Sequence, residues 1–244
     1  MKINTHSHVR LSSIALATAL LGTLSTTHAA SILVANHSFE SPVTSDYVGV
    51  GEYAGANSLA NYGWNISGAN TYLVKNGGLV SYTSGVDGNQ ALFFEPYNDG
   101  NVMVYQNTGA TYAAGTYTLT VNVGMGTGFA NYDEDASAEF QLLAYDGSYN
   151  YDLGVAATTI PKAQLVASPG NLGTYTYTLA LTGSESFIGD TVAIVLKANK
   201  NNSTYQNVSY DNVRLDFTAI PEPSSVTMLL GGIGALTLLR RRSV

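Results

Sequence analysis

Carboxylates and tyrosines are the residues of this chain that can do chemistry. It has 17 of each, no cysteine and only four histidines. Three of the histidines lie in the first 28 residues, which leaves His37 for the rest of the chain. Zinc–thiolate sites and cysteine nucleophiles are therefore excluded, and a serine triad would have to use His37. The sequence has no His-x-x-x-His pair and no Gly-Lys-Thr loop, so metal hydrolysis through histidines and nucleotide binding have no support.

Acidic residues are numerous, but their spacing singles out no catalytic pair. Glycoside hydrolysis needs two carboxylates at a defined separation, and residues 31–220 contain 16 acidic side chains. The densest run is Asp133-Glu134-Asp135, in a predicted loop between Gly124 and Ser137. A second calcium site and a solvated loop tip are both open interpretations of this run. We therefore expect a protein that is not an enzyme, and a polysaccharide-active hydrolase is the weakest alternative.

Tyrosines offer a different chemistry, because the C–H face of a sugar packs on an aromatic ring while its hydroxyls bind amides and carboxylates. The candidates for sugar binding are the tyrosines that do not fall on the buried side of a regularly alternating strand. They are Tyr47, Tyr53, Tyr62, Tyr82, Tyr97, Tyr132, Tyr149 and Tyr151. The predicted ligand-binding set is Tyr97, Asn98, Asp99, Tyr132, Tyr149 and Tyr151. Tyrosine also favours strands, so a surface tyrosine without a ligand is the alternative at each position. Trp64, the only tryptophan, is predicted to lie in the core.

The elements that position these residues are predicted to be β-strands. Apolar and polar residues alternate over residues 116–123, 138–144, 175–181 and 192–198, the period of a sheet with one buried face. Turn sequences such as Asp87-Gly88-Asn89 and Asp146-Gly147-Ser148 separate them. We find no convincing amphipathic helix between residues 31 and 220. The pattern predicts one all-β domain, a single antiparallel sandwich or barrel.

The two ends of the chain carry sequences typical of export. Lys2 and Arg10 precede an apolar stretch, and small residues around Ala29 suit signal peptidase, so residues 1–30 are predicted to be a signal peptide. At the other end, a polar motif precedes an apolar run and a basic cluster: Pro221-Glu222-Pro223, residues 224–239, and Arg240, Arg241 and Arg242. Arginines resist crossing a membrane, so the rest of the chain faces outwards.

The last 24 residues, 221–244, resemble the PEP-CTERM sorting signal of Gram-negative bacteria. The resemblance implies a transmembrane sorting helix, cleavage by an exosortase, and a host that makes exopolysaccharide. Residues 224–239 are shorter than the roughly 20 residues that usually span a bilayer. We expect an inner-membrane intermediate, with the mature protein at the cell surface or in the extracellular matrix.

The mature domain is predicted to span residues 31–220, and its net charge limits the classes of partner that it can bind. That segment has 5 basic and 16 acidic residues. Nucleic acid and anionic lipid surfaces are bound mainly by Lys and Arg, so neither is an expected partner. With no disulfide available, stability must come from a hydrophobic core or a bound metal ion.

Short motifs along residues 31–220 resemble the galactose-binding-like jelly roll of carbohydrate-binding modules. They are Asn36-His37-Ser38-Phe39-Glu40, Gly63-Trp64, Asp87-Gly88-Asn89-Gln90-Ala91-Leu92, Ala114-Gly115-Thr116-Tyr117-Thr118-Leu119 and Tyr210-Asp211-Asn212-Val213. In this fold the first and last strands are neighbours, so Glu40 and Asp211 are expected to converge. The resemblance implies a structural calcium ion there, held by oxygen ligands; strand-end carboxylates that bind backbone amides are the alternative. Asp211-Asn212 breaks the strand's alternation and predicts a bulge.

The sequence thus predicts an exported jelly-roll protein that interacts with exopolysaccharide or other glycans without catalysis. The alternative is a structural surface or biofilm protein that has no specific glycan ligand. Signal peptidase and an exosortase are the expected partners during export.

Overall fold

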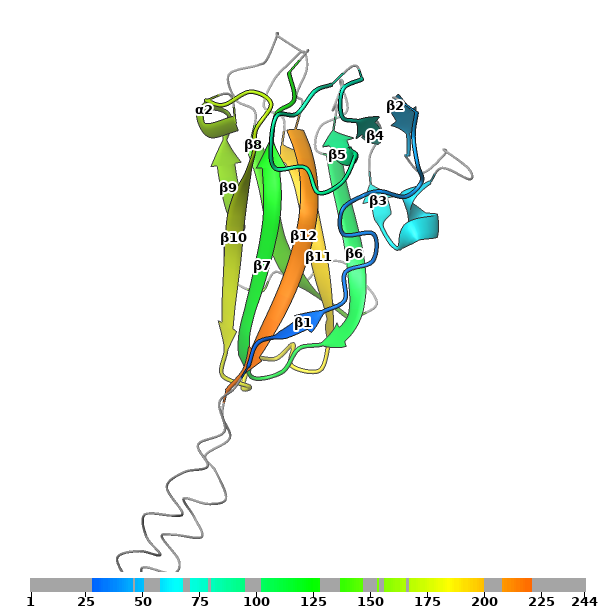
Figure 1. The fold of residues 1–244 in the computed structure, drawn as a ribbon. Coiled ribbons are helices and arrows are strands. Elements are labelled where there is room, and N and C mark those ends of the chain that lie inside the picture. The colour runs from blue at the N-terminus through cyan, green and yellow to red at the C-terminus, as the bar shows by residue number, and fades with distance from the viewer. Residues whose placement is uncertain are drawn as a thin grey trace, which may run out of the picture. The chain divides into compact units, whose positions relative to one another are not determined.

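Two antiparallel β-sheets pack face to face in the computed structural model (Figure 1). The structure describes residues 28–220 except for residues 46, 51–57, 68–70, 79, 95–101, 128–136, 147–152, 154–155, 166 and 200–207. Residues 29–219 form one compact unit. The prediction of an all-β antiparallel sandwich is confirmed.

The first sheet has seven strands, in the order β10, β7, β12, β5, β4 and β2, with β1 paired to β12 outside that path. Their bounds are β1 Ala30–Ile32, β2 Tyr47–Gly49, β4 Thr71–Lys75, β5 Gln90–Phe94, β7 Gly115–Gly124, β10 Leu172–Leu181 and β12 Val208–Ala219. The last strand therefore runs between β7 and β5, near the middle of the sheet. This position carries Asp211 into the interior.

The second sheet has five strands, in the order β3, β6, β11, β8 and β9. Their bounds are β3 Asn65–Ser67, β6 Val102–Thr111, β8 Ser137–Tyr145, β9 Thr158–Pro161 and β11 Thr191–Asn199. A 3-10 helix, η3 (Leu59–Tyr62), precedes β3, and a short helix, α2 (Lys162–Leu165), follows β9. These two short turns are the helical elements within the described residues, as the sequence pattern led us to expect.

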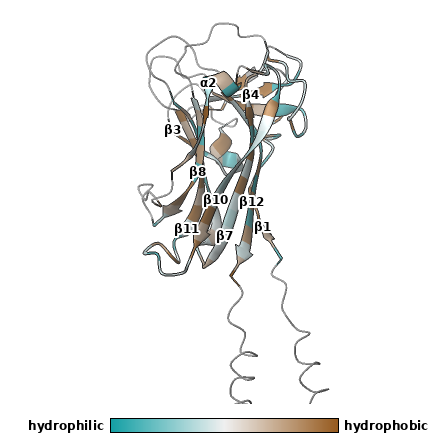
Figure 2. Cartoon of the chain, turned by 90° about the vertical axis from the view of Figure 1, so that its left-hand side faces the viewer, coloured by the Kyte–Doolittle hydropathy of each residue, from teal (hydrophilic) through white to brown (hydrophobic). Residues whose placement is uncertain are grey.

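Alternating side chains of the long strands form the core between the sheets. In β7, Tyr117, Leu119, Val121 and Val123 are buried and face the other sheet, as predicted. Trp64 is fully buried, packs against Phe39 with ring centroids 5.2 Å apart, and donates from Nε1 to the carbonyl of Ala35 at 2.8 Å. Figure 2 shows hydrophobic positions along the strands of both layers.

Three features of the described residues bear on the sequence predictions. The register of β12 against β7 shifts between Asp211 and Arg214, which confirms the predicted bulge. The prediction of Tyr82 as an exposed candidate for sugar binding is wrong, since its side chain is 6% exposed and its hydroxyl bonds with Ser209 Oγ at 2.6 Å. Among the described residues no helix has the length and apolar character needed to cross a membrane. The predicted helix within residues 224–239 lies outside that part of the chain.

Candidate functional site

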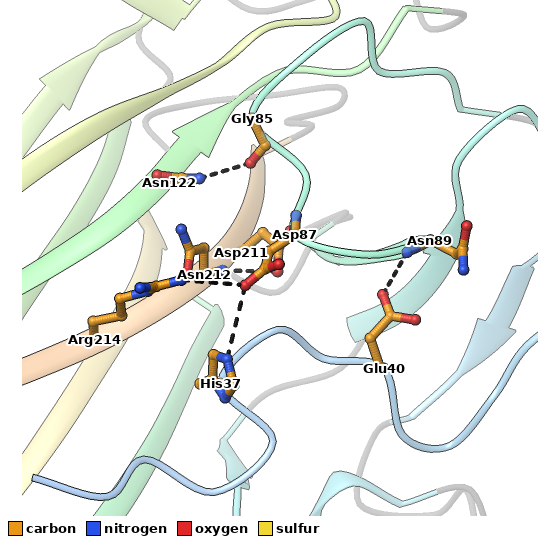
Figure 3. Close-up of polar contacts among 9 residues, drawn as sticks. All are labelled: His37, Glu40, Gly85, Asp87, Asn89, Asn122, Asp211, Asn212 and Arg214. Atoms are coloured by element: carbon orange, nitrogen blue, oxygen red, sulfur yellow. Dashed lines mark hydrogen bonds and ion pairs between the residues drawn. The ribbon is translucent and has the colours of Figure 1, made fainter.

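A cluster of polar side chains lies where the turn from Gly85 to Gln90 meets strand β12 and the segment after β1 (Figure 3). Three carboxylates lie along this turn, those of Glu40, Asp87 and Asp211. The sequence separates them by 47 and 124 residues. The jelly-roll topology brings them together, because β5 lies next to β12 in the sheet.

Asp211 is the buried member of the cluster, with no exposed surface. Its Oδ2 accepts a hydrogen bond from the backbone amide of Asp87 at 2.5 Å, and its Oδ1 accepts one from Asn212 at 2.7 Å. The pKa of Asp211 is raised to about 8, mainly by burial and to a smaller extent by the nearby charges of Asp87 and Glu40, against the two hydrogen bonds, which lower it. The carboxyl therefore carries a proton at neutral pH unless a cation lies beside it.

The bulge in β12 explains why Asp211 points inwards. Asn212 adopts a positive φ of 49°, which is a left-handed conformation that Asn tolerates better than most residues. Its backbone amide thereby turns back onto Asp211. The amide of Val213 then bonds to the carbonyl of His37 at 2.9 Å, so the bulge also ties β12 to the segment after β1.

Glu40 holds the far end of the turn. Its Oε1 accepts hydrogen bonds from the backbone amides of Asn89 at 2.7 Å and Gln90 at 2.8 Å. Gly88 adopts a φ of 106°, and a Cβ there would lie 2.5 Å from Glu40 Oε1. Glycine is therefore required at this position by both conformation and space.

The near end of the turn is fixed by Asn122 of β7. Its Nδ2 donates to the carbonyl of Gly85 at 2.7 Å, and its Oδ1 accepts from the hydroxyl of Thr174 at 2.8 Å. Asn122 is 6% exposed, so both ends of its amide are satisfied inside the protein. The turn over Asp211 is thus anchored at both ends.

Asp87 is the exposed member of the cluster and lies between two basic side chains. Its Oδ2 lies 3.8 Å from His37 Nε2 and 3.5 Å from Arg214 Nη2. Arg214 is further held by a hydrogen bond from its Nε to Asn212 Oδ1 at 2.6 Å. All three side chains are roughly half exposed, so these ion pairs contribute little to stability.

Two surface grooves border the cluster. One, of about 280 Å³, lies on the side of His37 and Arg214 and is lined by Ser31, Ile32, Leu33, Val34, His37, Val213 and Arg214. The other, of about 330 Å³, lies on the side of Glu40 and is lined by Glu40, Val43, Thr44, Lys75, Asn89 and Gln90. Neither reaches Asp211, which the turn covers.

The structure brings Glu40 and Asp211 to opposite ends of one turn. Whether they hold calcium stays a prediction, and within the described residues no group of three or more His, Asp or Glu side chains has the arrangement of a metal site. The sequence analysis missed Asp87, Asn122 and Arg214 as members of the cluster. The available signal was the Asp-Gly-Asn sequence at residues 87–89, which the sequence analysis assigns to a turn and to a jelly-roll motif but to no functional site.

The remaining predicted site residues lie outside the described part of the chain. They are Tyr97, Asn98, Asp99, Tyr132, Tyr149 and Tyr151, and the sorting residues Pro221, Glu222, Pro223, Arg240, Arg241 and Arg242. The glycan-binding set therefore stays a prediction.

Comparison with protein families identifies both parts of the chain. Residues 30–216 match the HpiC1-like family, described as HpiC1 cyclase. The chain belongs to this family. Residues 219–243 match the PEP-CTERM protein-sorting motif, which confirms an exported, membrane-transiting protein that depends on an exosortase for processing. The expectation of a protein that is not an enzyme is wrong, since this family is one of cyclases.

Solved structures agree with this assignment at the level of the fold. An apo cyclase from Fischerella sp. has 21% identity and a TM-score of 0.58, over 79% of this chain and 98% of that one. The Stig cyclase Fisc from Fischerella sp. TAU, in complex with (3Z)-3-(1-methyl-2-pyrrolidinylidene)-3H-indole, has 22% identity and a TM-score of 0.58, over 79% and 100%. The CBM22-1 xylan-binding domain of Paenibacillus barcinonensis Xyn10C has 12% identity and a TM-score of 0.44, over 80% and 99%. A comparison with curated proteins gives no match.

Proposed function

We propose that the mature domain is an exported cyclase in which Asp211 supplies the proton for ring closure. The observation that carries the proposal is the buried carboxyl of Asp211, whose pKa of about 8 keeps it protonated at neutral pH. A general acid works best when its pKa is near the working pH. Membership of a cyclase family supports the same reaction class.

The proposed reaction is an isomerisation in which Asp211 donates a proton to the substrate and the cyclised substrate later releases one. The Asp211 carboxyl protonates a carbon of a substrate double bond, and a second unsaturated group attacks the resulting cation to form the ring. The cyclised cation then loses one proton, so no other reactant is consumed. The amides of Asp87 and Asn212 stabilise the Asp211 carboxylate between the two transfers.

Access to Asp211 depends on the turn that covers it. Asp211 has no exposed surface, and the amide of Asp87 bonds to it directly, so a substrate contacts the carboxyl only when this turn moves aside. The groove beside His37 and Arg214 lies next to the turn and is the proposed entry side. Loops and turns commonly gate active sites in this way.

A calcium ion at Glu40 and Asp211 is the second proposal for the same residues. Carboxylate oxygens are the hard donors that calcium takes, and an uncompensated buried carboxyl is the kind of group that a cation stabilises. Both oxygens of Asp211 and Oε1 of Glu40 already accept backbone amides, so an ion there would draw its other ligands from carbonyls and water. Such an ion would lower the pKa of Asp211 and give it a structural role instead of a proton-donating one.

A solvent-deuterium assay tests the acid role. Residues 30–219 are incubated in D2O with indoles that bear an alkene side chain, a choice guided by the indole bound to the Fischerella sp. TAU cyclase. Mass spectrometry detects cyclised product that carries one deuterium. We expect product from the unchanged protein, at least a hundredfold less from Asp211→Asn, and an unchanged amount from Asp216→Asn, a matched change on the same strand.

The outcomes separate the proposals. Equal turnover by Asp211→Asn and the unchanged protein contradicts the acid role, and so does the absence of deuterated product across the panel. Calcium binding by calorimetry that is lost in both Glu40→Gln and Asp211→Asn supports the metal site. Selective binding to a glycan panel supports the matrix-binding prediction. For location we propose the cell surface or the extracellular matrix of a Gram-negative bacterium.

A further inference from the structure

The sorting tail, residues 221–244, follows the last strand of the sandwich with one residue between them. Strand β12 is paired with β7 up to Ala219, which lies opposite Gly115. The match to the PEP-CTERM motif begins at this same residue, and its Pro-Glu-Pro sequence begins at Pro221. Only Ile220 therefore separates the paired strand from the sequence near which an exosortase is predicted to cleave.

The end of β12 is held by a strand on each side. Strand β1 pairs with it on one side, where Ala30 lies opposite Phe217. Strand β7 pairs with it on the other side, where Thr116 lies opposite Thr218. Figure 1 shows β1 beside the lower end of β12. The backbone immediately before the tail is thus part of the interior of the sheet.

Phe217 also holds this end through its side chain. Its ring packs on Tyr117, with ring centroids 4.6 Å apart, and belongs to the border of the hydrophobic core. It covers Gly115 as well, since a Cβ added there would collide with the ring. Ala219 is exposed, and strand ends open more easily than strand centres. Opening of the strand end therefore meets its main resistance at Phe217.

A folded strand end and an enzyme-bound tail compete for the same residues. Proteins that capture a peptide as an extended strand bind it through its backbone N–H and C=O groups. A protease that cleaves near Pro221 also holds residues on the N-terminal side of the bond. The backbone of residues 217–219 is already paired with β1 and β7, so it is not free to pair with an enzyme.

We propose that residues 217–219 are part of the segment that the exosortase binds, and that they leave the sheet before the tail is removed. The enzyme holds them through their backbone. Cleavage of a transiently opened segment follows the population of the open form when opening and closing are fast. The stability of the end of β12 thereby sets the rate at which the protein leaves its membrane intermediate. This step precedes the chemistry of Asp211 and does not depend on it.

A disulfide across the strand end tests the proposal, because the chain has no cysteine of its own. Thr116→Cys and Thr218→Cys lie opposite each other on paired strands, within reach of a disulfide. The matched control joins Thr118→Cys to Thr178→Cys, across β7 and β10. Residues 30–244 are oxidised, inserted into proteoliposomes that contain an exosortase, and followed by mass spectrometry. We expect the crosslink at Thr218 to slow tail removal at least tenfold relative to the reduced protein, and the control crosslink to change nothing.

Two further variants change the strand end without a crosslink. A flexible spacer of about six Gly and Ser residues between Ala219 and Ile220 supplies a free extended segment. Tail removal is then expected to be faster and insensitive to the crosslink at Thr218. Phe217→Ala is expected to speed tail removal at least threefold, because it eases opening. Phe187→Ala, the control, changes another partly buried aromatic that packs against the same core and should leave the rate unchanged.

Each comparison has a result that overturns the proposal. Equal rates for the oxidised and reduced forms of the protein crosslinked at Thr218 overturn it. A spacer variant that the crosslink still slows, or equal rates for Phe217→Ala and Phe187→Ala, would do the same. The oxidised and reduced forms are one polypeptide, and the fluorescence of the buried Trp64 verifies that both are folded. The crosslink comparison therefore does not depend on how the substitutions affect folding.

Discussion

The protonation of Asp211 predicts an unusual dependence of stability on pH. Burial raises its pKa to about 8, against about 3.9 in an unfolded chain, so between these values the native state binds more protons than the unfolded state. Stability is then fully present below pH 4 and is lost as the pH rises through 8. At about 1.4 kcal/mol for each pKa unit, the loss is about 5 kcal/mol by pH 9.

The substitution Asp211→Asn removes this dependence of stability on pH, but it also weakens the hydrogen bonding at the site. The Asn amide accepts one of the two backbone bonds from Asp87 and Asn212, but its Nδ2 meets the other donor, which costs about 1–3 kcal/mol. The variant is therefore less stable than the unchanged protein at pH 4. It is more stable at pH 9, by about 2–4 kcal/mol, because it carries no buried charge.

Urea unfolding at pH 4, 7 and 9 measures these differences, with chelator present and then with calcium. Trp64 is the only tryptophan and is fully buried, so its fluorescence reports loss of the core. The control Asp216→Asn keeps the pH dependence of the unchanged protein. A stability that is flat from pH 4 to 9 in chelator, or equal slopes for Asp211→Asn and the unchanged protein, refutes the reasoning. If calcium abolishes the dependence of stability on pH, the carboxyl of Asp211 binds the ion.

Three further predictions concern the turn, an exposed loop and the contact between the sheets. Gly88→Ala destabilises the fold by about 1–3 kcal/mol in urea unfolding, more than Gly77→Ala, because both have positive φ but the added Cβ at Gly77 meets nothing within 4 Å. Hydrogen bonds from the backbone amides of Thr182 and Gly183 lower the pKa of Glu185 to about 2. The contribution of Glu185 to the stability of the fold is therefore lost as the pH falls from 4.5 through 2. Acid unfolding of Glu185→Gln should lack that part of the stability loss. Tyr210→Phe removes a hydroxyl that accepts from the amide of Glu139 at 3.1 Å and donates to the carbonyl of Lys197, and calorimetric melting should show about 1–3 kcal/mol lost. An unchanged melting curve for Tyr210→Phe would contradict a stabilising role for this bridge between the sheets.

The sequence predicted the sandwich well because its strands are long and half-buried. In β7 from Thr116 to Val123, and in β10 from Thr174 to Leu179, polar residues alternate with apolar or aromatic ones, and this pattern depends only on which face is buried. The bulge at Asp211 was also predictable, since the alternation changes phase there. Tyr82 was misjudged because its burial depends on distant residues: it packs in a cluster with Phe93 and Leu172, and its hydroxyl bonds with Ser209, 127 residues away.

The composition of the site was less accessible to sequence reasoning. Asp87 belongs to the cluster only because β5 and β12 are neighbours, and the sequence of its turn gives no sign of that contact. The raised pKa of Asp211 depends on burial, which depends in turn on how β12 is flanked. Catalysis was rejected because the sequence shows no nucleophile or metal motif and singles out no carboxylate pair, but a single buried carboxyl is enough to deliver a proton.

Direct titration of the Asp211 carboxyl is the measurement that tests the central claim most closely. Carbon-13 NMR of labelled residues 30–219 in chelator, with Asp211→Asn to assign the resonance, follows its protonation from pH 4 to 10. The account predicts a midpoint near 8, which leaves the acid protonated at neutral pH. A midpoint below 5 in the absence of any metal ion would contradict both the buried acid and the cyclase mechanism built on it.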